Sequence, residues 1–421
     1  MNKTVVIVGG SLSGLICGVQ LKRLGCKVTI LEKDGSAERE SAHAGVGFRV
    51  NVETFLKQYD VSGVTAAIPS SASQFALFKR PKALVTGSNL RVTSWGHLYR
   101  ILRANFDGFT SDSCPTPPAQ RETDGEGRYL IGSRVTELQY ADGIVTVRYT
   151  DSETGLESRI DADFVIGADG IHSTVRDLLH LPMKKEYAGY VSWRATVPES
   201  LLSKESAEYF SDAVSVNQFR HSYMMCYVIP TDSGSFAPGE RLMNIVWYYN
   251  VKEDSEEFNR IFTDIHGVRH RNTVPHGLVK SEEWERVRDA FKPRLAAPFV
   301  ELLYKVKTPY VTKVNDSICT QPTFFEGHGI LVGDALTTLR PHTGSAAEQA
   351  AFHCLCLGPV WEGKKTLEAW SREVRTYSKR LWLIGRLVGA FGQGTVLELL
   401  KALFLYVTFL IRCKVGCSGM K

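Results

Sequence analysis

Thr4-Val-Val-Ile-Val-Gly-Gly-Ser-Leu-Ser-Gly14 lies near the start of the chain and joins a strand pattern to a glycine-rich turn. Its first five residues, Thr4 to Val8, are all β-branched, as is typical of a buried strand in a parallel sheet. An apolar helical pattern follows as far as Leu24, and Lys27-Val-Thr-Ile-Leu31 predicts a second strand. The stretch therefore predicts a βαβ unit, in which a helix connects two parallel strands.

The turn in this unit has the features of a dinucleotide-binding site. Gly9, Gly10 and Gly14 let the backbone approach a pyrophosphate at a helix N-terminus. Glu32 follows Gly9 by 23 residues, where an acid can accept a ribose hydroxyl. Ser11 replaces the second glycine of the usual pattern; its Cβ crowds a pyrophosphate, whereas its hydroxyl could donate a hydrogen bond to it. The alternative is a turn that binds no phosphate, and the strand, helix and acid together favour the nucleotide.

Length and composition bound the remaining possibilities. The 421 residues suggest two or three domains, and 43% apolar residues can fill large cores. A net charge of +5 is too small to indicate a nucleic-acid partner. The nine cysteines have no zinc-site spacing, so we expect reduced thiols and no metal site. With no leader pattern before Thr4, the expected location is the cytoplasm.

Two more strand ends resemble the first. Gly167-Ala-Asp-Gly170 follows an apolar run, and Asp169 lies where a strand's carboxyl end meets a ligand crevice. A third strand ends at Gly333-Asp334. After the loop Leu339-Arg-Pro-His-Thr-Gly344, small residues begin a helix predicted over Ser345–Leu357. Small side chains there let a helix N-terminus lie against a planar ligand.

The segments between these motifs have other patterns. Gly45 and Gly47 indicate either close approach to a bulky group or a turn before the helix expected over Glu53–Tyr59. Alternation over Tyr129–Leu138, Ile144–Tyr149 and Glu157–Ile160 predicts a small antiparallel meander. From Tyr187 to about Pro309, aromatic strand patterns alternate with charged helical ones, which indicates a second domain with a mixed sheet.

Taken together, Gly9 to Gly14 with Glu32, Gly167 to Gly170, and Gly333-Asp334 with Pro341 and Gly344 resemble the single-component FAD-dependent aromatic hydroxylases of the p-hydroxybenzoate hydroxylase type. The resemblance covers about residues 1–380 and is greatest to the dihydroxypyridine-hydroxylase branch. It implies an α/β fold: a Rossmann-like FAD-binding domain with an inserted mixed-sheet α+β substrate domain and a C-terminal helical tail. The implied domains are 1–186 and 310–380 for FAD, 187–309 for substrate and 381–421 for the tail.

The resemblance also carries site residues to matching positions. Glu32 would bind the adenosine ribose, Gly47 and Arg103 would touch FAD, and Asp334 would bind its ribityl or pyrophosphate region. The full cofactor set is Gly9, Gly10, Ser11, Ser13, Gly14, Glu32, Lys33, Gly47, Arg103, Asp169, Asp334, Gly344, Ser345, Ala346 and Ala347. The chain departs from many relatives at Trp95, where they have arginine, and at Glu348, where they have asparagine.

The reaction implied is NAD(P)H- and O₂-dependent hydroxylation or epoxidation of an electron-rich aromatic or enolic small molecule through a flavin C4a-hydroperoxide. Either NADH or NADPH would bind transiently. His342, in the loop facing the flavin's reactive edge, is the candidate catalytic residue, with an ordinary pKa near 6.5 suited to proton transfer or, when neutral, to hydrogen bonding. The alternative for His342 is a packing role, with Tyr190, Tyr223 and Arg194 as other partners for a substrate oxygen. An oxidase or dehydrogenase without oxygen insertion, and a non-catalytic nucleotide-binding regulator, remain as alternative functions.

Residues 402–411 contain no charge and are followed by Arg412 and Lys414. This run is too short to span a bilayer, which needs about 20 residues. We expect a helix docked on the body or on a homodimer partner; attachment of residues 395–412 to a membrane surface is the less favoured alternative.

Overall fold

The first sheet of this computed structural model, which describes residues 3–39, 44–77, 79–211 and 213–418, has the strand order β17-β18-β10-β1-β2-β6. Strands β1 (Thr4–Val8) and β2 (Lys27–Leu31) have the predicted bounds. The parallel strands β10 (Phe164–Gly167), β18 (Gly329–Leu331) and β6 (Gly127–Leu130) extend the sheet, and β17 (Thr323–Phe324) pairs antiparallel at its edge. Val5, Val6 and Ile7 are fully buried, each contributing about 1.5–3 kcal/mol.

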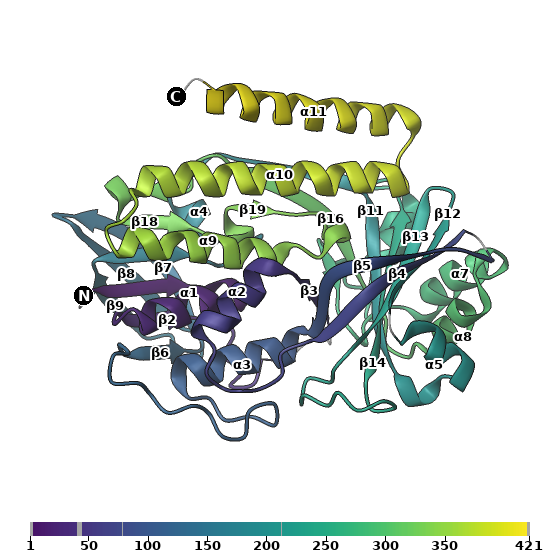
Figure 1. Ribbon diagram of the computed structural model, residues 1–421, viewed down its shortest axis with the longest axis horizontal. Helices are drawn as coiled ribbons and strands as arrows, with labels where there is room; N and C mark the ends of the chain where they lie inside the picture. Colours follow the sequence, from purple (N-terminus) through teal and green to yellow (C-terminus); the bar gives the residue numbers. More distant parts are fainter. Residues whose placement is uncertain (1–2, 40–43, 78, 212, 419–421) are drawn as a thin grey trace.

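Two layers cover this sheet (Figure 1). The helices α1 (Leu12–Arg23), α3 (Trp95–Asp107) and α9 (Ala346–Trp361) pack together on one side. On the other lies the meander β7 (Ser133–Ala141), β8 (Ile144–Asp151) and β9 (Glu157–Ala162). The strand predicted over Tyr129–Leu138 was wrong. Gly132, at φ +65°, turns the chain, so the first part joins β2 as β6 and the second begins the meander.

The second sheet has ten strands and forms the wall of a separate domain. Its central strands are β11 (Met183–Pro198), β14 (Leu242–Asn250), β13 (Ser222–Ile229) and β12 (Ala213–Phe219). The flanking strands are β4 (Ile68–Leu77), β5 (Arg80–Ser94) and β3 (Gly45–Phe48) on one side, and β15 (Thr273–Val274), β16 (Tyr310–Cys319) and β19 (Thr337–Thr338) on the other. The sheet is mixed, as predicted, since β12 and β4 are parallel. It takes strands from both sides of residues 187–309, which the sequence pattern did not indicate.

Alternation along the central strands gives the sheet two different faces. Trp193 and Trp247 are cross-strand partners and pack outward against Trp284 in a fully apolar core. This core is covered by α5 (Lys204–Phe210), α7 (Ser281–Phe291) and α8 (Ala297–Lys305), as Figure 1 shows, and by α6 (Glu256–Ile261), whose Phe258 and Ile261 belong to it. Residues on the opposite face, including Arg194 and Tyr248, point towards the first domain.

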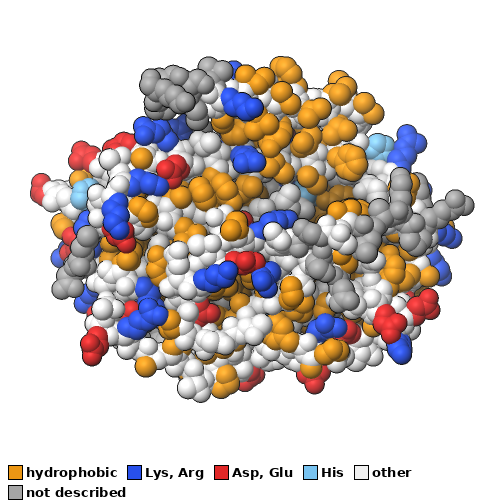
Figure 2. All heavy atoms as spheres, viewed as in Figure 1, with side chains coloured by type: hydrophobic (Ala, Val, Ile, Leu, Met, Phe, Trp, Pro, Cys, Tyr) orange, Lys and Arg blue, Asp and Glu red, His pale blue; other side chains and the backbone are white. Residues whose placement is uncertain are grey.

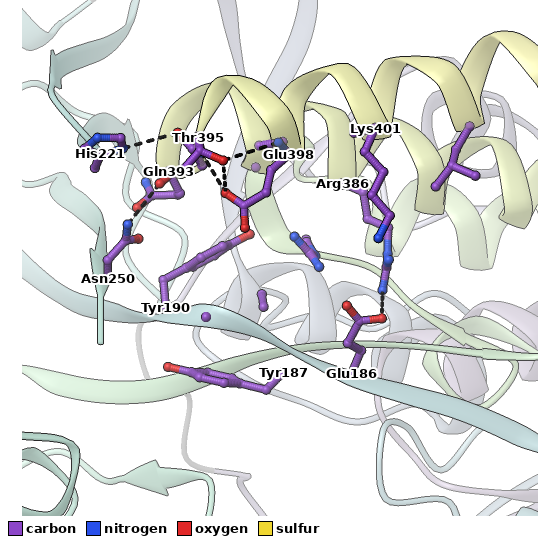
Figure 3. A pocket seen from close by; sticks show the side chains of 18 of the residues that line it. Glu186, Tyr187, Tyr190, His221, Asn250, Arg386, Gln393, Thr395, Glu398 and Lys401 are labelled. Carbon is purple, nitrogen blue, oxygen red and sulfur yellow. Dashed lines mark hydrogen bonds and ion pairs between the residues drawn. The ribbon is translucent and has the colours of Figure 1, made fainter. Parts of the chain in front are cut away.

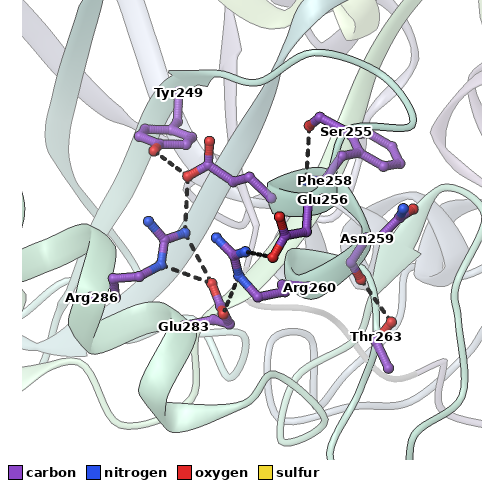
Figure 4. Close-up of polar contacts among 10 residues, drawn as sticks. Tyr249, Ser255, Glu256, Phe258, Asn259, Arg260, Thr263, Glu283 and Arg286 are labelled. Atoms are coloured by element: carbon purple, nitrogen blue, oxygen red, sulfur yellow. Dashed lines mark hydrogen bonds and ion pairs between the residues drawn. The ribbon is translucent and has the colours of Figure 1, made fainter.

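Polar contacts fix the outer helices to the sheet (Figure 4). Tyr249 of β14 donates to Glu257 of α6 at 2.7 Å, and Arg286 of α7 bonds to Glu257 at 3.0 Å. Glu283 accepts from both Arg286 and Arg260. These contacts hold the outer helices on the sheet. The cavity described below lies on the opposite, inner face of the sheet.

A long helix, α10 (Leu367–Gln393), runs across both domains and passes without a break through the predicted limit at residue 380. The chain then reverses, and α11 (Val396–Ser418) lies along α10 (Figure 1). Tyr406 and Phe409 of α11 pack on a small core that includes Trp382 and Leu383. In the described part of the chain, none of the helices has the length and apolarity required to cross a membrane.

Candidate active site

The three glycine motifs meet at the carboxyl edge of the parallel sheet. Gly9 follows β1, Asp169 follows β10 and Gly333 follows β18, and these strands are neighbours. A Cβ on Gly9, which has φ +100°, would lie 2.7 Å from the carbonyl oxygen of Ala168. A Cβ on Gly333 would collide with the Ser13 side chain. Backbone from all three motifs therefore packs at the edge where ligands bind in such sheets.

Glu32, at the end of β2, faces the first glycine turn. Its carboxylate is 4% exposed and accepts from the Gly10 N–H at 2.8 Å and from the Asp34 N–H at 3.0 Å. Lys33 beside it is exposed. Ser11 is the N-cap residue of α1, yet its side chain makes no capping hydrogen bond, and the first turn holds no acid. The start of α1 can therefore receive an anion.

Two carboxyl groups at this edge have oxygens without partners. The Oδ1 atoms of Asp169 and Asp334 are buried and make no hydrogen bond within the described residues. Burial raises the pKa of Asp334 to about 6 and also raises that of Asp169. Asp169 uses its other oxygen to accept from the Val175 N–H at 3.0 Å. Buried acceptors of this kind call for donors, such as the hydroxyl groups of a ribose or ribityl chain.

Arg103 is held inside α3 by contacts with its own neighbours. It donates to the Tyr99 hydroxyl at 2.8 Å and to both carboxylate oxygens of Asp107. Its guanidinium carbon lies 3.7 Å from the ring centre of Tyr129, whose hydroxyl donates to the Gly10 carbonyl at 2.8 Å. Arg103 thus supports the glycine turn through Tyr129, a residue that sequence analysis did not single out. Direct contact with FAD stays a prediction.

A cavity of about 550 Å³ lies between the two domains, and glycine and other small residues line part of one wall. Gly47 and Gly344 line it, and a Cβ on Gly344 would lie 3.6 Å from the Cα of Gly47. Ser345, Ala346 and Ala347 continue this wall into α9. The predicted residues of both loops therefore lie side by side, and their small side chains leave room for a flat ligand.

Glu348 of α9 binds backbone N–H groups at the start of another helix. Its buried carboxylate accepts from the backbone N–H groups of Arg49 at 3.0 Å, Asn51 at 2.8 Å and Val52 at 3.2 Å. It therefore caps α2 (Val50–Tyr59) and fixes the β3 loop against α9. Trp95, the other departure from the relatives, lines the cavity and stacks on Tyr99 with ring centres 4.8 Å apart.

The opposite wall is the inner face of the second sheet. Tyr223, Met225 and Tyr227 alternate along β13 and line the cavity with Arg194 of β11. Burial lowers the pKa of Arg194, but the nearby hydroxyl groups of Tyr310, Tyr248 and Tyr227 raise it by more. The pKa is therefore raised overall, and the guanidinium is charged. Among the residues lining the cavity, Asp334 is the single acid. The cavity therefore favours an anionic or ionisable ligand.

The hairpin of β4 and β5 closes the side of this wall with Ser73, Phe75, Leu90 and Val92. These residues were not predicted from the sequence. Alternation shows which residues share one face of a strand, but it does not show which strand lies beside it. Here β4 pairs in parallel with β12, about 140 residues away in the chain.

His342, in the short helix η5 (Pro341–Thr343), is 8% exposed and hydrogen-bonded through both ring nitrogens. Nε2 is 2.5 Å from the Tyr190 hydroxyl, and Nδ1 is 2.5 Å from the Tyr223 hydroxyl. Burial, and then the charge of Arg340, lower the pKa of His342 to about 3. The expectation of a pKa near 6.5 was therefore wrong, and the ring is neutral. In the same place, a Cβ on Gly389 of α10 would lie 2.7 Å from the Tyr190 hydroxyl.

Tyr190 also lines a second cavity of about 460 Å³ between β11 and the two C-terminal helices (Figure 3). Glu186, Arg386 and Lys401 line this cavity as well, and the Glu186–Arg386 ion pair at 2.6 Å crosses it. Arg340 borders both cavities. The Tyr190–His342–Tyr223 contacts therefore form part of the partition between the two.

The described residues contain no group of three or more His, Cys, Asp or Glu side chains that could hold a metal ion. Of the nine cysteines, the eight whose side chains the structure describes are free thiols.

Comparisons with known proteins agree with this geometry. A family model described as FAD binding domain-like matches residues 187–316. The chain is 26% identical to the 2,6-dihydroxypyridine 3-monooxygenase of Paenarthrobacter nicotinovorans over 87% of this chain and 85% of that protein. A solved structure of 2,6-dihydroxypyridine-3-hydroxylase from Arthrobacter nicotinovorans aligns with a TM-score of 0.77 and 24% identity over 94% of each chain. Klebsiella pneumoniae HpxO complexed with FAD and uric acid aligns with a TM-score of 0.67 and 18% identity over 97% of this chain and 92% of that one. The expected fold is confirmed.

Proposed function

We propose that this chain, a relative of the single-component FAD-dependent aromatic hydroxylases, is itself an FAD-dependent monooxygenase. It uses NAD(P)H and O₂ to hydroxylate or epoxidise a small, flat, electron-rich aromatic or enolic molecule. The observation that carries the proposal is the 550 Å³ cavity with a glycine-lined wall facing a wall that holds Arg194 and Tyr223. A planar cofactor and a planar substrate can occupy such a space face to face.

The residues at the sheet edge fit FAD. In this proposal Glu32, which accepts from the Gly10 N–H, would bind the adenosine ribose, and the start of α1 would bind the pyrophosphate. The unpartnered Oδ1 atoms of Asp169 and Asp334 would accept from hydroxyl donors. Gly47 and Gly344 line the cavity on the side where a planar ring system would lie. Bound FAD supplies the oxidation of NAD(P)H and the activation of O₂.

Arg194 and Tyr223 orient the substrate and stabilise its oxygen as charge develops there. The guanidinium is a fixed positive charge in a cavity whose other sheet residues include Val214, Val216 and Val246. Charge stabilisation is stronger in such a water-poor place. Hydroxylation of a phenol is favoured by its anion, because the ring then carries more electron density. A substrate with an acidic ring hydroxyl suits this cavity.

His342 acts behind Tyr223 in this proposal, as a positioning residue. Both of its nitrogens are engaged by tyrosines, so it reaches the substrate through the Tyr223 hydroxyl. A neutral ring has one donor and one acceptor. If Tyr190 donates to Nε2, then Nδ1–H donates to Tyr223, whose own proton is free to bind the substrate oxygen. Burial raises the pKa of Tyr223 well above its ordinary value, which keeps that proton in place.

Substrate-stimulated NAD(P)H oxidation tests this function. The purified yellow protein should oxidise NADH or NADPH faster when 2,6-dihydroxypyridine or another member of a panel of hydroxylated pyridines, phenols and polycyclic enols is added. Arg194→Gln should keep FAD and lose most of the response, whereas Arg288→Gln, in a pair with Asp289 on the outer helix α7, should behave like the parent. A protein that holds FAD but responds to no member of the panel would favour the non-catalytic regulator.

A further inference from the structure

The outer side of α11 carries a row of large apolar side chains that nothing in the described chain covers (Figure 2). Leu397 is 76% exposed, Phe404 69% and Ile411 57%. The full set on the outer side of this helix is Val396, Leu397, Leu400, Leu403, Phe404, Val407, Leu410 and Ile411, and Phe391 precedes it at the end of α10. We call these nine residues the apolar band. A helix that is apolar all round is normally buried, since proteins rarely expose large apolar patches without a partner.

The inner side of the same helix is already occupied. Tyr406 and Phe409 pack on the core formed by Leu339, Trp382 and Leu383. The helix is thus docked on the body, as expected, and still presents a second apolar face. Because α11 lies along α10, this second apolar face points away from the body.

The charges around the band identify the partner. Over residues 391–414, Glu398 is the single acid, and it is engaged with the backbone and hydroxyl of Thr395. The basic residues Arg412 and Lys414 lie at the exposed end of the helix, whereas Lys401 lines the second cavity. A second copy of this chain would offer these cations no acid within residues 391–414 other than Glu398. An anionic lipid surface pairs with the cations and accepts the apolar side chains at once.

The band also continues into the mouth of the substrate cavity. Phe391 is 70% exposed and Phe75 is 39% exposed, and both line the 550 Å³ cavity. A bilayer surface bound by the band would bring this mouth to the level of the lipid, where apolar aromatic compounds concentrate.

We propose that the apolar band binds the surface of an anionic lipid bilayer, with α11 lying in the plane of the membrane and the cavity mouth facing the lipid. Lipid binding by the apolar band does not depend on the reaction that the chain catalyses. The role of the cavity mouth as a substrate entrance rests on the proposed function. Because vesicle binding needs no turnover, failure of this inference and failure of the proposed function are distinguishable.

Vesicle flotation tests the binding face. The FAD-containing parent should float with vesicles of phosphatidylcholine and phosphatidylglycerol, and more weakly with phosphatidylcholine alone or at high salt. Leu400→Asp with Phe404→Asp should lower partitioning by roughly tenfold or more. The matched control is Leu156→Asp with Ile265→Asp, since those side chains are 69% and 51% exposed outside the band, and it should bind like the parent. Arg412→Gln should lower binding to anionic vesicles by about fivefold, as expected for the loss of one cation.

A second measurement locates the mouth. Phe391→Trp should gain fluorescence that brominated lipid quenches, whereas Leu156→Trp should not. Far-ultraviolet circular dichroism and FAD content confirm that each variant is folded. A parent that ignores anionic vesicles overturns the proposal, and if light scattering then shows a dimer that Leu400→Asp with Phe404→Asp dissociates, the partner is a second copy. A pair of aspartates that leaves vesicle binding intact overturns the proposal too.

Discussion

Asp316→Asn should destabilise the protein and disturb the candidate active site together. Asp316 lies on β16 and is 1% exposed. Its Oδ2 accepts from Arg340 Nε at 2.5 Å, and its Oδ1 accepts from Arg386 at 2.9 Å and from the Trp382 indole at 3.0 Å. One carboxylate therefore joins β16, the residue preceding η5, and α10. Asparagine has a similar shape but no negative charge. Its amide NH₂ group would also face N–H donors, which cannot accept a hydrogen bond.

The expected loss follows from the burial of these groups. Arg340 is 9% exposed and has no other ion-pair partner among the described residues. Arg386 retains Glu186 at 2.6 Å. Removing one member of a buried pair costs about 3–5 kcal/mol. Because Arg386 keeps a partner, we expect the lower end, about 3 kcal/mol. Turnover should fall as well, since Arg340 borders the cavity and is followed by Pro341 and His342.

Urea denaturation followed by tryptophan fluorescence measures the change in unfolding free energy, and substrate-stimulated NAD(P)H oxidation measures the change at the site. Glu186→Gln is the matched control. Its side chain is 46% exposed, so its pair with Arg386 should contribute only about 0–1 kcal/mol. An Asp316→Asn protein as stable as the parent would refute the argument that this carboxylate holds α10 and the loop together.

Three further predictions concern the cofactor, the tyrosine–histidine contacts and acid stability. Glu32→Ala should weaken FAD binding by about 1–3 kcal/mol, measured by titrating the apoprotein with FAD; unchanged affinity would remove Glu32 from the cofactor site. Tyr223→Phe and His342→Ala should each slow substrate-stimulated turnover by about 100-fold with normal FAD content, and neither should remove a limb of the pH profile near neutrality, because His342 is neutral down to a pKa of about 3. His353 is also buried with its pKa lowered to about 3. Below about pH 6.5 the unfolded chain binds a proton on each of these two rings, whereas the folded protein does not until about pH 3. The unfolding free energy should therefore fall as the pH is lowered from about 6.5 to about 3, by about 1.4 kcal/mol per pH unit for each ring. Urea midpoints that stay constant from pH 7 to pH 5 would contradict these pKa values.

The sequence predicted the nucleotide edge of the fold well because its signals are local. A β-branched strand, a glycine turn and an acid at a fixed distance identify β1, α1 and Glu32 within 30 residues. The motifs at Asp169 and Asp334 follow the same rule, and parallel pairing brings them to one edge. The strand predicted through Gly132 failed because the alternation continues across a turn that only the positive φ of a glycine reveals.

The substrate side could be predicted only in outline. The aromatic strands of residues 187–309 were predicted from the sequence. Which face of their sheet lines the cavity depends on pairing with β4 and β16, which come from distant segments. The role of Glu348 as a cap for α2 depends on the approach of two loops. The pKa of His342 depends on burial beneath α10, whose Gly389 allows the close contact. None of these is a property of a short stretch of sequence.

The central claim is that the chain inserts oxygen from O₂ into a ring held between the two walls of the cavity. Turnover under ¹⁸O₂ with a substrate that stimulates NAD(P)H oxidation, followed by mass spectrometry of the product, tests this claim most directly. We expect one labelled oxygen atom in the product, and none when the label is supplied in water. An oxidised product without label, formed together with hydrogen peroxide, would contradict it and identify an oxidase.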